Sequence, residues 1–437
     1  MKGSNILIAM IEGGGNVTPM LGLARKFLNS GHSISILSEP CLEKTIKEAG
    51  ASFIPFTKHF TRTDRKEDLF KDWNASKINN PVFDRVMFGP ASDVINQCIE
   101  VMRTKSIDLL VVDVLIFPGI IAAEHLGIPK IVVFHMPEFL PGPNRPPGNM
   151  GLKPGKGFFY KLRDKILAKL MTTKFDEFKA VLNEKLASLS LTPLNHTLDL
   201  FDRADLRLIQ TTKSFDVPIE PGPKNVRYIG PELDDPDWVS DQEWVTPWPD
   251  QDVKPLVVIS FSSTFQNQSK AIQNSINALS QLPVNGIVTL GPAMEDQEFT
   301  VSDNVVVMKS VKHSMLFPHA NLIITHGGHG TIVRALSYGL PIICLPMGRD
   351  QDDNAIKVAI KGCGKKLSPK SSPRSIRKAV EHILSDNKFK INAKKMQAEI
   401  NKPGSIEEVI KEINDLINKK KSVTHLDVCQ RDFKDSK

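Results

Sequence analysis

The chain has 437 residues, of which 41% are hydrophobic and 24% are charged, and it carries a formal net charge of +7 at pH 7. This length accommodates two domains of roughly 200 residues, each with its own core. No apolar run is long enough for a membrane-spanning helix. The basic residues are not clustered with aromatic ones, as they are in nucleic-acid-binding proteins. The five cysteines are scattered and never in C-x-x-C spacing, and no secretory signal pattern opens the chain, so we expect free thiols and a cytoplasmic protein.

The front of the chain predicts a strand, a turn, a helix and a second strand. Asn5 to Met10 is typical of a buried strand, and Gly13 to Gly15 of a tight turn. Thr18 is expected to be the N-cap of a helix over Met20 to Asn29, and Ser33 to Leu37 predicts the next strand. Strands that alternate with helices favour a parallel α/β sheet.

A nicotinamide-binding site is an alternative interpretation of this front unit. The sequence GGGNVT follows a predicted strand, and Glu39 at the end of the second strand would then bind a ribose hydroxyl. Thr18 occupies the third glycine position of that pattern, which disfavours the alternative because the helix could not pack closely on the strand.

Two titratable residues follow further predicted strands of the front half. Asp113 follows the apolar run Leu109 to Val112, and His135 follows Lys130 to Phe134. Open α/β sheets place their sites at the carboxyl ends of strands, so both residues are candidate general bases. A helix-capping aspartate and a packed core histidine are the structural alternatives.

The segment Phe158 to Phe178 alternates aromatic and aliphatic residues with lysines and predicts a basic amphipathic helix. Either the helix covers an acceptor cleft, or it docks on a membrane surface that carries a lipid acceptor. The irregular stretches Phe56 to Pro90 and Pro137 to Gly157 are expected to contribute to acceptor recognition.

The segment Asp216 to Asp252 is rich in proline, aspartate and tryptophan and lacks an apolar period, which indicates a connector. We therefore expect a first domain over residues 1–215, a linker over 216–252, a second domain over 253–400, and a C-terminal helix and tail over 401–437. Apolar residues at helical spacing place that helix at Ser405 to Asn418, with a polar end after Lys419. Four further strands are predicted, at Leu206 to Thr211, Pro255 to Phe261, Gly286 to Leu290 and Asn304 to Met308.

The strongest pattern lies in the second domain. A strand over Leu322 to Ile324 leads into the turn HGGHGT at His326 to Thr331, then into a short helix over Thr331 to Tyr338. The strand Ile342 to Leu345 then delivers the polar cluster GRDQDDN, residues 348–354, to the same sheet edge.

This order of elements suits a nucleoside diphosphate that carries a sugar. Bare glycine amides at a helix N-terminus favour a pyrophosphate, and either His326 or His329 would donate a further hydrogen bond to a phosphate oxygen. Asp350 and Gln351 would bind sugar hydroxyls, and the hydroxyls of Ser263 and Thr264 would meet the diphosphate from the opposite side. The arrangement requires no metal.

Residues Lys312 to Ala355, KHSMLFPHANLIITHGGHGTIVRALSYGLPIICLPMGRDQDDNA, resemble the donor-binding signature of the UDP-glycosyltransferase superfamily, closest to its bacterial macrolide and antibiotic glycosyltransferase branch. The resemblance implies two facing Rossmann-like α/β domains with parallel sheets and an interdomain cleft, the glycosyltransferase-B fold. It further implies inverting, metal-independent transfer of a hexose from a UDP- or dTDP-sugar, with no other cofactor.

The resemblance also assigns residues to the donor. His313 stands where the family usually has a glutamine near the base, and Arg334 where many members have a glutamate that holds the ribose. The expected donor-binding residues are His326, Gly327, Gly328, Gly330, Thr331, Asp350, Gln351, Ser263, Thr264, Val311 and His313.

The segment GGGNVTPMLGLARKFLNSGHSISIL resembles the opening of the family's acceptor domain. We expect Gly15, Val17 and His135 to contact the acceptor. Many members place their catalytic histidine where this chain has Asn16. A carboxamide cannot take up a proton, so Asn16 is expected to orient the acceptor and Asp113, at the position of the family's partner aspartate, to act as the base.

We expect the acceptor to be a small, hydrophobic, hydroxyl-bearing molecule such as a natural product, phenolic, macrolide or lipid. No nucleic-acid partner is expected, and the chain is expected to be a monomer or weak dimer with peripheral membrane contact as an option. The alternative function is a catalytically weak or silent sugar-nucleotide-binding protein, which the asparagine at position 16 makes conceivable.

Overall fold

The computed structural model describes residues 3–65, 69–70, 81–143, 145–237, 239, 244–249, 253–262, 267–291, 294, 296–402 and 406–432, with side chains to residue 420. Ser263 and Thr264, predicted to contact the donor, lie outside these residues. Among the described residues, no helix has both the length and the apolar character needed to cross a bilayer.

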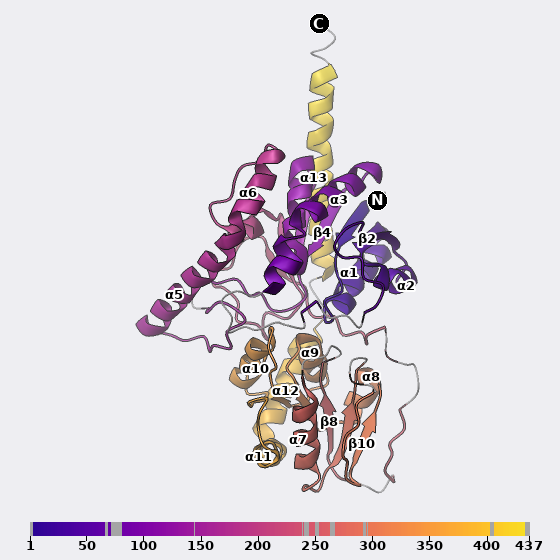
Figure 1. Cartoon of the computed structure of the whole chain (residues 1–437), viewed down its shortest axis with the longest axis vertical. Coiled ribbons are helices and arrows are strands. Elements are labelled where there is room, and N and C mark those ends of the chain that lie inside the picture. Colours follow the sequence, from indigo (N-terminus) through magenta and orange to yellow (C-terminus); the bar gives the residue numbers. More distant parts are fainter. Residues whose placement is uncertain are drawn as a thin grey trace.

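Two parallel sheets, one in each half of the chain, form the centres of two α/β domains stacked along the long axis of the molecule (Figure 1). The first sheet has the order β3-β2-β1-β4-β5-β6-β7, and the second has the order β10-β9-β8-β11-β12-β13. The strands of the first sheet are β1 (Asn5–Ala9), β2 (Ser33–Ser38), β3 (Ser52–Pro55), β4 (Leu109–Asp113), β5 (Lys130–Phe134), β6 (Leu206–Ile209) and β7 (Val226–Tyr228). Those of the second are β8 (Leu256–Ser260), β9 (Asn285–Thr289), β10 (Val305–Met308), β11 (Leu322–Thr325), β12 (Ile342–Cys344) and β13 (Gly364–Lys366).

Helices cover both faces of each sheet, as parallel sheets require. The first half contributes α1 (Val17–Asn29), α2 (Glu43–Glu48), α3 (Ala91–Thr104), α4 (Ile120–Leu126), α5 (Phe158–Phe175) and α6 (Lys179–Ser188). The second contributes α7 (Ser269–Leu279), α8 (His313–Leu316), α9 (His329–Ser337), α10 (Gln351–Ile360), α11 (Pro373–Ser385) and α12 (Asn387–Ile400), followed by α13 (Ile406–Asp432). The expected α/β class with two Rossmann-like domains is therefore confirmed.

Each sheet has a hydrophobic core on either side. Every residue of β4, β5 and β8 is buried, because their near-continuous Leu, Val and Ile side chains face helices on both sides of a central strand. Strand order reverses between β1 and β4 in the first sheet and between β8 and β11 in the second, so each sheet has a switch point where ligands of such folds bind.

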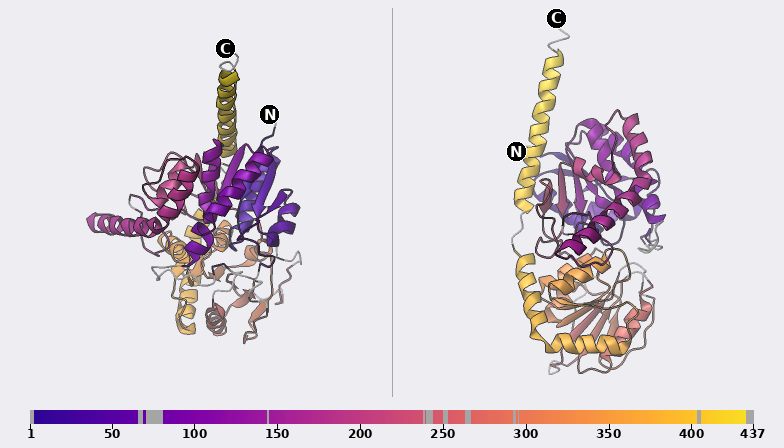
Figure 2. Two further views of the ribbon diagram at one scale, coloured as in Figure 1. Left: turned by 45° about the horizontal axis from the view of Figure 1, so that its top comes forward. Right: turned by 90° about the vertical axis from the view of Figure 1, so that its left-hand side faces the viewer.

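The long C-terminal helix α13 returns from the second domain to the first, and Figure 2 shows it running along the side of the first domain. Ile413 and Ile417 are buried in the core beside β1, and Arg227 forms an ion pair with Glu412 at 2.7 Å. The helix continues to Asp432, past Lys419, where we expected a polar tail.

Some local expectations were wrong. Helix α1 begins at Val17 rather than after an N-cap at Thr18, and the flanking residue Asn16 makes no capping bond because its side chain is engaged elsewhere. Strands β3, β7 and β13 were not predicted, since they are three or four residues long and carry few fully buried side chains. Strand β7 lies inside the segment expected to be a connector, so the first sheet extends to Tyr228.

Candidate functional site

A cavity of about 660 Å³ lies between the two domains, lined by residues that follow the carboxyl ends of strands in both sheets. Gly13 to Gly15 follow β1 and His135 follows β5, whereas His326 follows β11 and Gln351 comes after β12. The two switch points therefore face one shared cavity, as open α/β sheets predict.

The turn HGGHGT forms part of the second-domain wall. Gly327 has a φ of 98°, and a Cβ on Gly328 would come within 2.5 Å of Nε2 of His326, so both positions depend on glycine. A Cβ on Gly330 would meet nothing within 4 Å, so the loop borders open space there. Helix α9 begins at His329, two residues earlier than predicted, and its first amides point to this space without intrahelical acceptors.

The histidines of this turn are uncharged near neutral pH. Burial lowers the pKa of His326 to about 3, and the nearby Arg349 charge adds to the effect. Burial likewise lowers the pKa of His329 to about 3, with a smaller contribution from His135 of the opposite domain. His326 can therefore donate one hydrogen bond to a phosphate oxygen while Nδ1 lies 3.2 Å from the Thr325 hydroxyl.

The predicted sugar-binding pair, Asp350 and Gln351, lines the same cavity. Asp350 Oδ2 accepts a hydrogen bond from Asn354 Nδ2 at 2.7 Å, and burial raises the pKa of the carboxyl against the opposing effect of this hydrogen bond. The carboxamide oxygen of Gln351 accepts from the Met347 amide at 2.7 Å, and the same side chain carries an NH₂ group that is a hydrogen-bond donor.

The region that departs from the family pattern forms a further part of the cavity. His313 stacks on Phe317 with ring centroids 4.2 Å apart, and burial followed by the Arg334 charge lowers its pKa to about 3. Arg334 donates from Nε to the Leu233 carbonyl at 3.2 Å and from Nη2 to the Asp234 carbonyl, so it anchors the connector. Val311 is buried in the same wall.

On the first domain, three predicted residues meet in one chain of contacts. Asp113 Oδ2 accepts from Asn16 Nδ2 at 2.7 Å, and Oδ1 accepts from the Leu115 amide at 2.8 Å. Nδ1 of His135 lies 3.4 Å from Asp113 Oδ1. Asp113 is fully buried behind the cavity wall, whereas His135 lines the cavity. This differs from the expectation that Asp113 itself faces the acceptor.

Asn16 also lies behind the wall and does not face an acceptor. Its side chain donates to the Ile11 carbonyl at 2.8 Å and accepts from the Gly13 amide at 2.9 Å, so it shapes the glycine turn and holds Asp113. Gly15 does line the cavity, with open space where a Cβ would lie. Val17, expected at the acceptor, is buried in the core beside β1.

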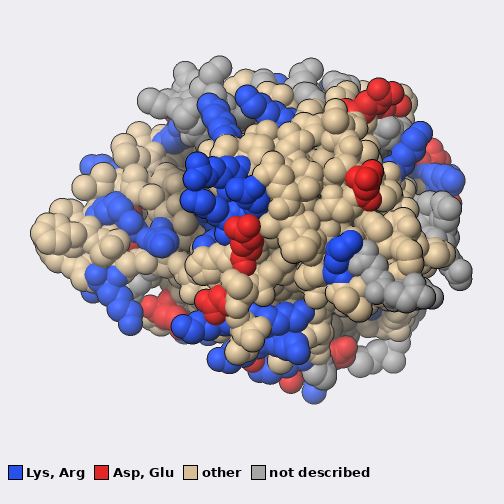
Figure 3. Space-filling view, turned by 90° about the horizontal axis from the view of Figure 1, so that it is seen from below, with Lys and Arg blue, Asp and Glu red and all other residues tan. Residues whose placement is uncertain are grey.

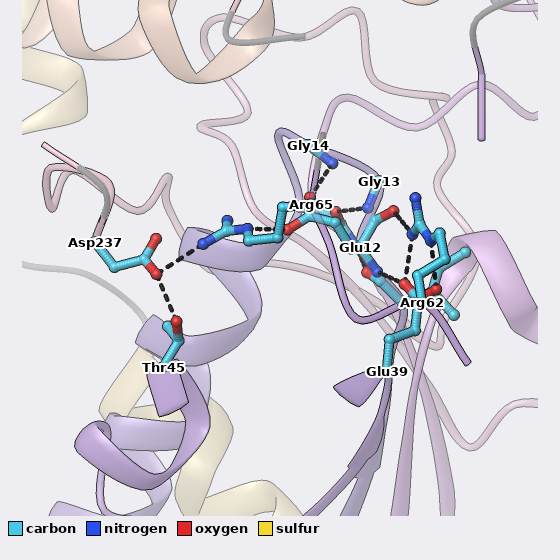
Figure 4. A network of polar contacts seen from close by, with 10 residues as sticks. Glu12, Gly13, Gly14, Glu39, Thr45, Arg62, Arg65 and Asp237 are labelled. Carbon is cyan, nitrogen blue, oxygen red and sulfur yellow. Dashed lines mark hydrogen bonds and ion pairs between the residues drawn. The ribbon is translucent and has the colours of Figure 1, made fainter. Parts of the chain in front are cut away.

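A polar network fixes the glycine turn to the connector, as Figure 4 shows. Glu12 Oε1 accepts from the Gly14 amide at 2.6 Å, and Glu12 Oε2 accepts from Arg65 Nε at 2.7 Å. Arg65 also donates to Asp237 of the connector at 2.8 Å. The rear of the site is thereby fixed by residues far apart in the sequence.

Glu39 belongs to the same network and is not available to a ribose. Its carboxylate is fully buried, accepts from Arg62 Nε at 2.7 Å and from the Glu12 amide at 2.6 Å, and is thus satisfied by the protein. The nicotinamide interpretation, which required Glu39 at a ligand, is wrong for this structure.

The remaining first-domain wall is apolar. It combines side chains from α5 and from the segments before α3 and after β5, namely Phe70, Phe83, Met87, Phe139, Met171 and Phe175. Such a wall suits a hydrophobic molecule that presents its polar group towards His135.

Two arginines at the cavity were not predicted as site residues. Arg349 has a φ of 58° and its guanidinium lies 5.2 Å from the centroid of the Phe70 ring, which orients it beside His326. Arg65 lines the cavity from the first domain. The sequence offered a signal only for Arg349, which lies within the polar cluster after β12.

Comparison with known proteins agrees with this architecture. Residues 273–416 match the family described as Erythromycin biosynthesis protein CIII-like, C-terminal domain. The chain is 24% identical over 409 residues to 4'-demethylrebeccamycin synthase of Lentzea aerocolonigenes, covering 91% of this chain and 96% of that protein. It is 21% identical over 422 residues to NDP-glycosyltransferase YjiC of Bacillus subtilis, covering 96% and 99%.

Solved structures share the fold. The calicheamicin glycosyltransferase CalG4 superposes with a TM-score of 0.72 at 20% identity, covering 96% of this chain and 99% of that one. Glycosyltransferase VinC in complex with dTDP superposes with a TM-score of 0.67 at 18% identity, covering 95% and 100%. Both similarities extend over the two domains and the intervening cleft.

Proposed function

Because the chain belongs to the UDP-glycosyltransferase superfamily, in its macrolide and antibiotic glycosyltransferase-like branch, we propose that this glycosyltransferase moves a hexosyl group from a UDP- or dTDP-sugar to a hydroxyl of a hydrophobic acceptor. The observation that carries the proposal is one cavity with two chemically different walls. The second-domain wall presents helix amides, His326 and Asp350, and the first-domain wall presents His135 among apolar side chains.

The donor fits the second-domain wall. The unpaired amides at the start of α9 and the guanidinium of Arg349 favour the diphosphate, and the neutral His326 ring adds a donor without adding charge. Asp350 and the NH₂ group of Gln351 complement sugar hydroxyls. Strong binding of the departing diphosphate by these groups stabilises the charge that develops in the transition state without a metal ion.

His135, rather than Asp113, is proposed as the base. Both oxygens of Asp113 already accept hydrogen bonds and the carboxylate lies behind the wall, so it has no path to an acceptor. With Nδ1–H directed to Asp113, Nε2 of His135 is free to accept a proton. The 3.4 Å distance is longer than a good hydrogen bond, and such contacts shorten when substrate binds.

The reaction then follows from the placement of the walls. His135 lines the same cavity as Asp350 and His329 of the second domain, so in this proposal it faces the donor sugar across the cleft. The acceptor hydroxyl passes its proton to Nε2, its oxygen bonds to the anomeric carbon, and the bond from that carbon to the phosphate oxygen breaks on the opposite side. Attack opposite the leaving group inverts the anomeric configuration.

The relatives' names support natural-product acceptors and nucleotide-sugar donors, since they include 4'-demethylrebeccamycin synthase, an NDP-glycosyltransferase and a structure with dTDP. Localisation in the cytoplasm is part of the same proposal. The four cysteines with described side chains, Cys41, Cys98, Cys344 and Cys363, are unpaired, which fits a reducing compartment.

The test is a panel of UDP- and dTDP-sugars, with binding measured by thermal shift and transfer to phenolic and macrolide acceptors measured by mass spectrometry. We expect at least one donor to raise the melting temperature and to be consumed. His326→Ala and Asp350→Ala should abolish transfer, whereas the control Glu381→Ala, at an exposed position of α11, should not. Binding without transfer or hydrolysis would favour the silent sugar-nucleotide-binding alternative, and no response to any donor would refute the proposal.

A further inference from the structure

Helix α5 projects from the first domain as an arm, visible at the left of Figure 1. Its inner end is part of the cavity wall, where Met171 and Phe175 are buried. Its outer end carries the most exposed large apolar side chains of the described first domain, with Phe159 82% and Phe158 73% exposed. The arm therefore presents an apolar surface that no described part of the chain covers.

The helix has two apolar faces rather than one. Met171 and Phe175 lie on the face that packs against the domain, together with the buried Asp164. A second stripe, spaced by three or four residues and thus on one side of a helix, faces solvent and consists of Phe159, Leu162, Ile166 and Leu170. An ordinary surface helix needs only the first face, so the second is unexplained by the fold.

Basic side chains flank this outer stripe. Residues 146–175 contain seven lysines and arginines and one acidic residue, Asp164, which is buried and paired with Arg163 at 2.7 Å. Lys161, Lys165 and Lys169 recur at four-residue spacing beside the stripe, and all three are exposed. Seen from below in Figure 3, the arm at the left ends in uncharged atoms with Lys and Arg atoms behind them.

We propose that α5 docks this protein on an anionic lipid surface. The stripe would enter the boundary between head groups and acyl chains while the flanking lysines meet lipid phosphates, the arrangement of interfacial amphipathic helices. A second copy of the chain is a poorer occupant, because two such arms would bring like-charged flanks together with no exposed acidic residue on either arm to pair with them.

The docked arm also has a consequence for the acceptor, which rests on the proposed function. Leu170 belongs both to the outer stripe and to the cavity lining, so the lipid-facing stripe and the apolar wall are continuous. An acceptor dissolved in the bilayer would then reach His135 from the membrane side without crossing water. The acceptor class implied is an amphiphile with a hydroxyl near its polar end.

The experiment is co-sedimentation of the full chain with vesicles of phosphatidylcholine alone and of phosphatidylcholine mixed with phosphatidylglycerol. We expect binding to the mixed vesicles that weakens with salt and little binding to the neutral ones. Since each basic residue near an anionic surface contributes about fivefold to partitioning, Lys161→Gln, Lys165→Gln and Lys169→Gln together should weaken binding about a hundredfold. The apolar double variant Leu162→Ser, Ile166→Ser should also lose binding to the mixed vesicles.

Matched controls remove equal charge or apolarity elsewhere. Lys378→Gln, Lys388→Gln and Lys395→Gln remove three exposed lysines of the second domain, and Val181→Ser with Ile391→Ser removes two exposed apolar side chains outside α5. Both controls should bind like the parent. Three outcomes would each overturn the proposal. They are an equal loss of vesicle binding in a control variant, no binding of the parent protein to anionic vesicles, and a dimer seen in sedimentation that Leu162→Ser abolishes. Nucleotide-sugar thermal shifts of the same variants report separately on the proposed function.

Discussion

The assignment of His135 as a base held by Asp113 predicts that the two residues act as one unit. Their closest atoms are 3.4 Å apart, and at an effective dielectric constant near 20 two full charges at that distance interact by roughly 5 kcal/mol. With about half a charge on the imidazole in the transition state, Asp113 would lower the barrier by roughly 2–3 kcal/mol, about a hundredfold in rate. His135 as the base is worth roughly 10²–10⁴-fold.

The assay is a double-mutant cycle on kcat, measured at saturating donor with Asp113→Asn, His135→Asn and the double variant. We expect the double variant to be no slower than His135→Asn alone, because Asp113 acts only through the ring. Losses that multiply in the double variant, or a His135→Asn variant within about tenfold of the parent, would refute this reasoning.

Folding controls accompany the cycle, because Asp113→Asn has a structural cost of its own. The carboxylate accepts hydrogen bonds from both Asn16 Nδ2 and the Leu115 amide, and a carboxamide has only one oxygen for these two donors. Urea unfolding of each variant therefore separates loss of fold from loss of rate. His135→Asn leaves both hydrogen bonds in place and is the cleaner of the two perturbations.

Two further predictions concern stability. Asn16→Ala removes three hydrogen bonds, of which two are buried and one of these is made to a carboxylate, so the free energy of unfolding should fall by about 3 kcal/mol in urea titrations. Transfer should be slowed less than by Asp113→Ala, and equal damage would contradict the division of roles. His326 and His329 have pKa values of about 3 in the folded protein and 6.5 in the unfolded chain. Between these two values only the unfolded chain takes up protons. The stability that these histidines contribute is therefore fully present above pH 6.5 and is lost as the pH falls towards 3. Each histidine should lower the free energy of unfolding by roughly 1 kcal/mol at pH 5.5 relative to pH 7. His329→Asn should reduce this dependence on pH, which would be absent were the rings exposed.

The second-domain motif could be predicted closely because its signals are local. A run of β-branched residues, glycines and a short helix follow one another within one unit, so β11 and β12 lie where expected and His326, Asp350 and Gln351 meet at one cavity. Helix α9 was predicted to begin at Thr331, but it begins at His329. Gly330 was interpreted as part of the turn, whereas it lies in the first turn of the helix, a conformation that glycine can also adopt.

The first-domain site could be predicted only in part, because it depends on contacts between distant residues. Asp113 was found from its place after a strand, but whether its carboxylate or a neighbour faces the cavity depends on which strands adjoin β4. The contacts of Arg65 with Asp237 and of Arg334 with the connector join segments without any shared sequence pattern. Short strands such as β13 were missed because three residues carry no period.

Sheet order is compatible with the proposed histidine base in a chain that has asparagine at position 16. Strand β4 lies between β1 and β5, so residues that follow either neighbour approach the carboxylate of Asp113 from opposite sides. In the resembled family the histidine follows the first strand; here Asn16 takes that side as a hydrogen-bond donor, and His135 approaches from the β5 side. The proposal therefore keeps Asp113 at the centre of the site and places its histidine partner after β5 instead of after β1, within the same order of strands.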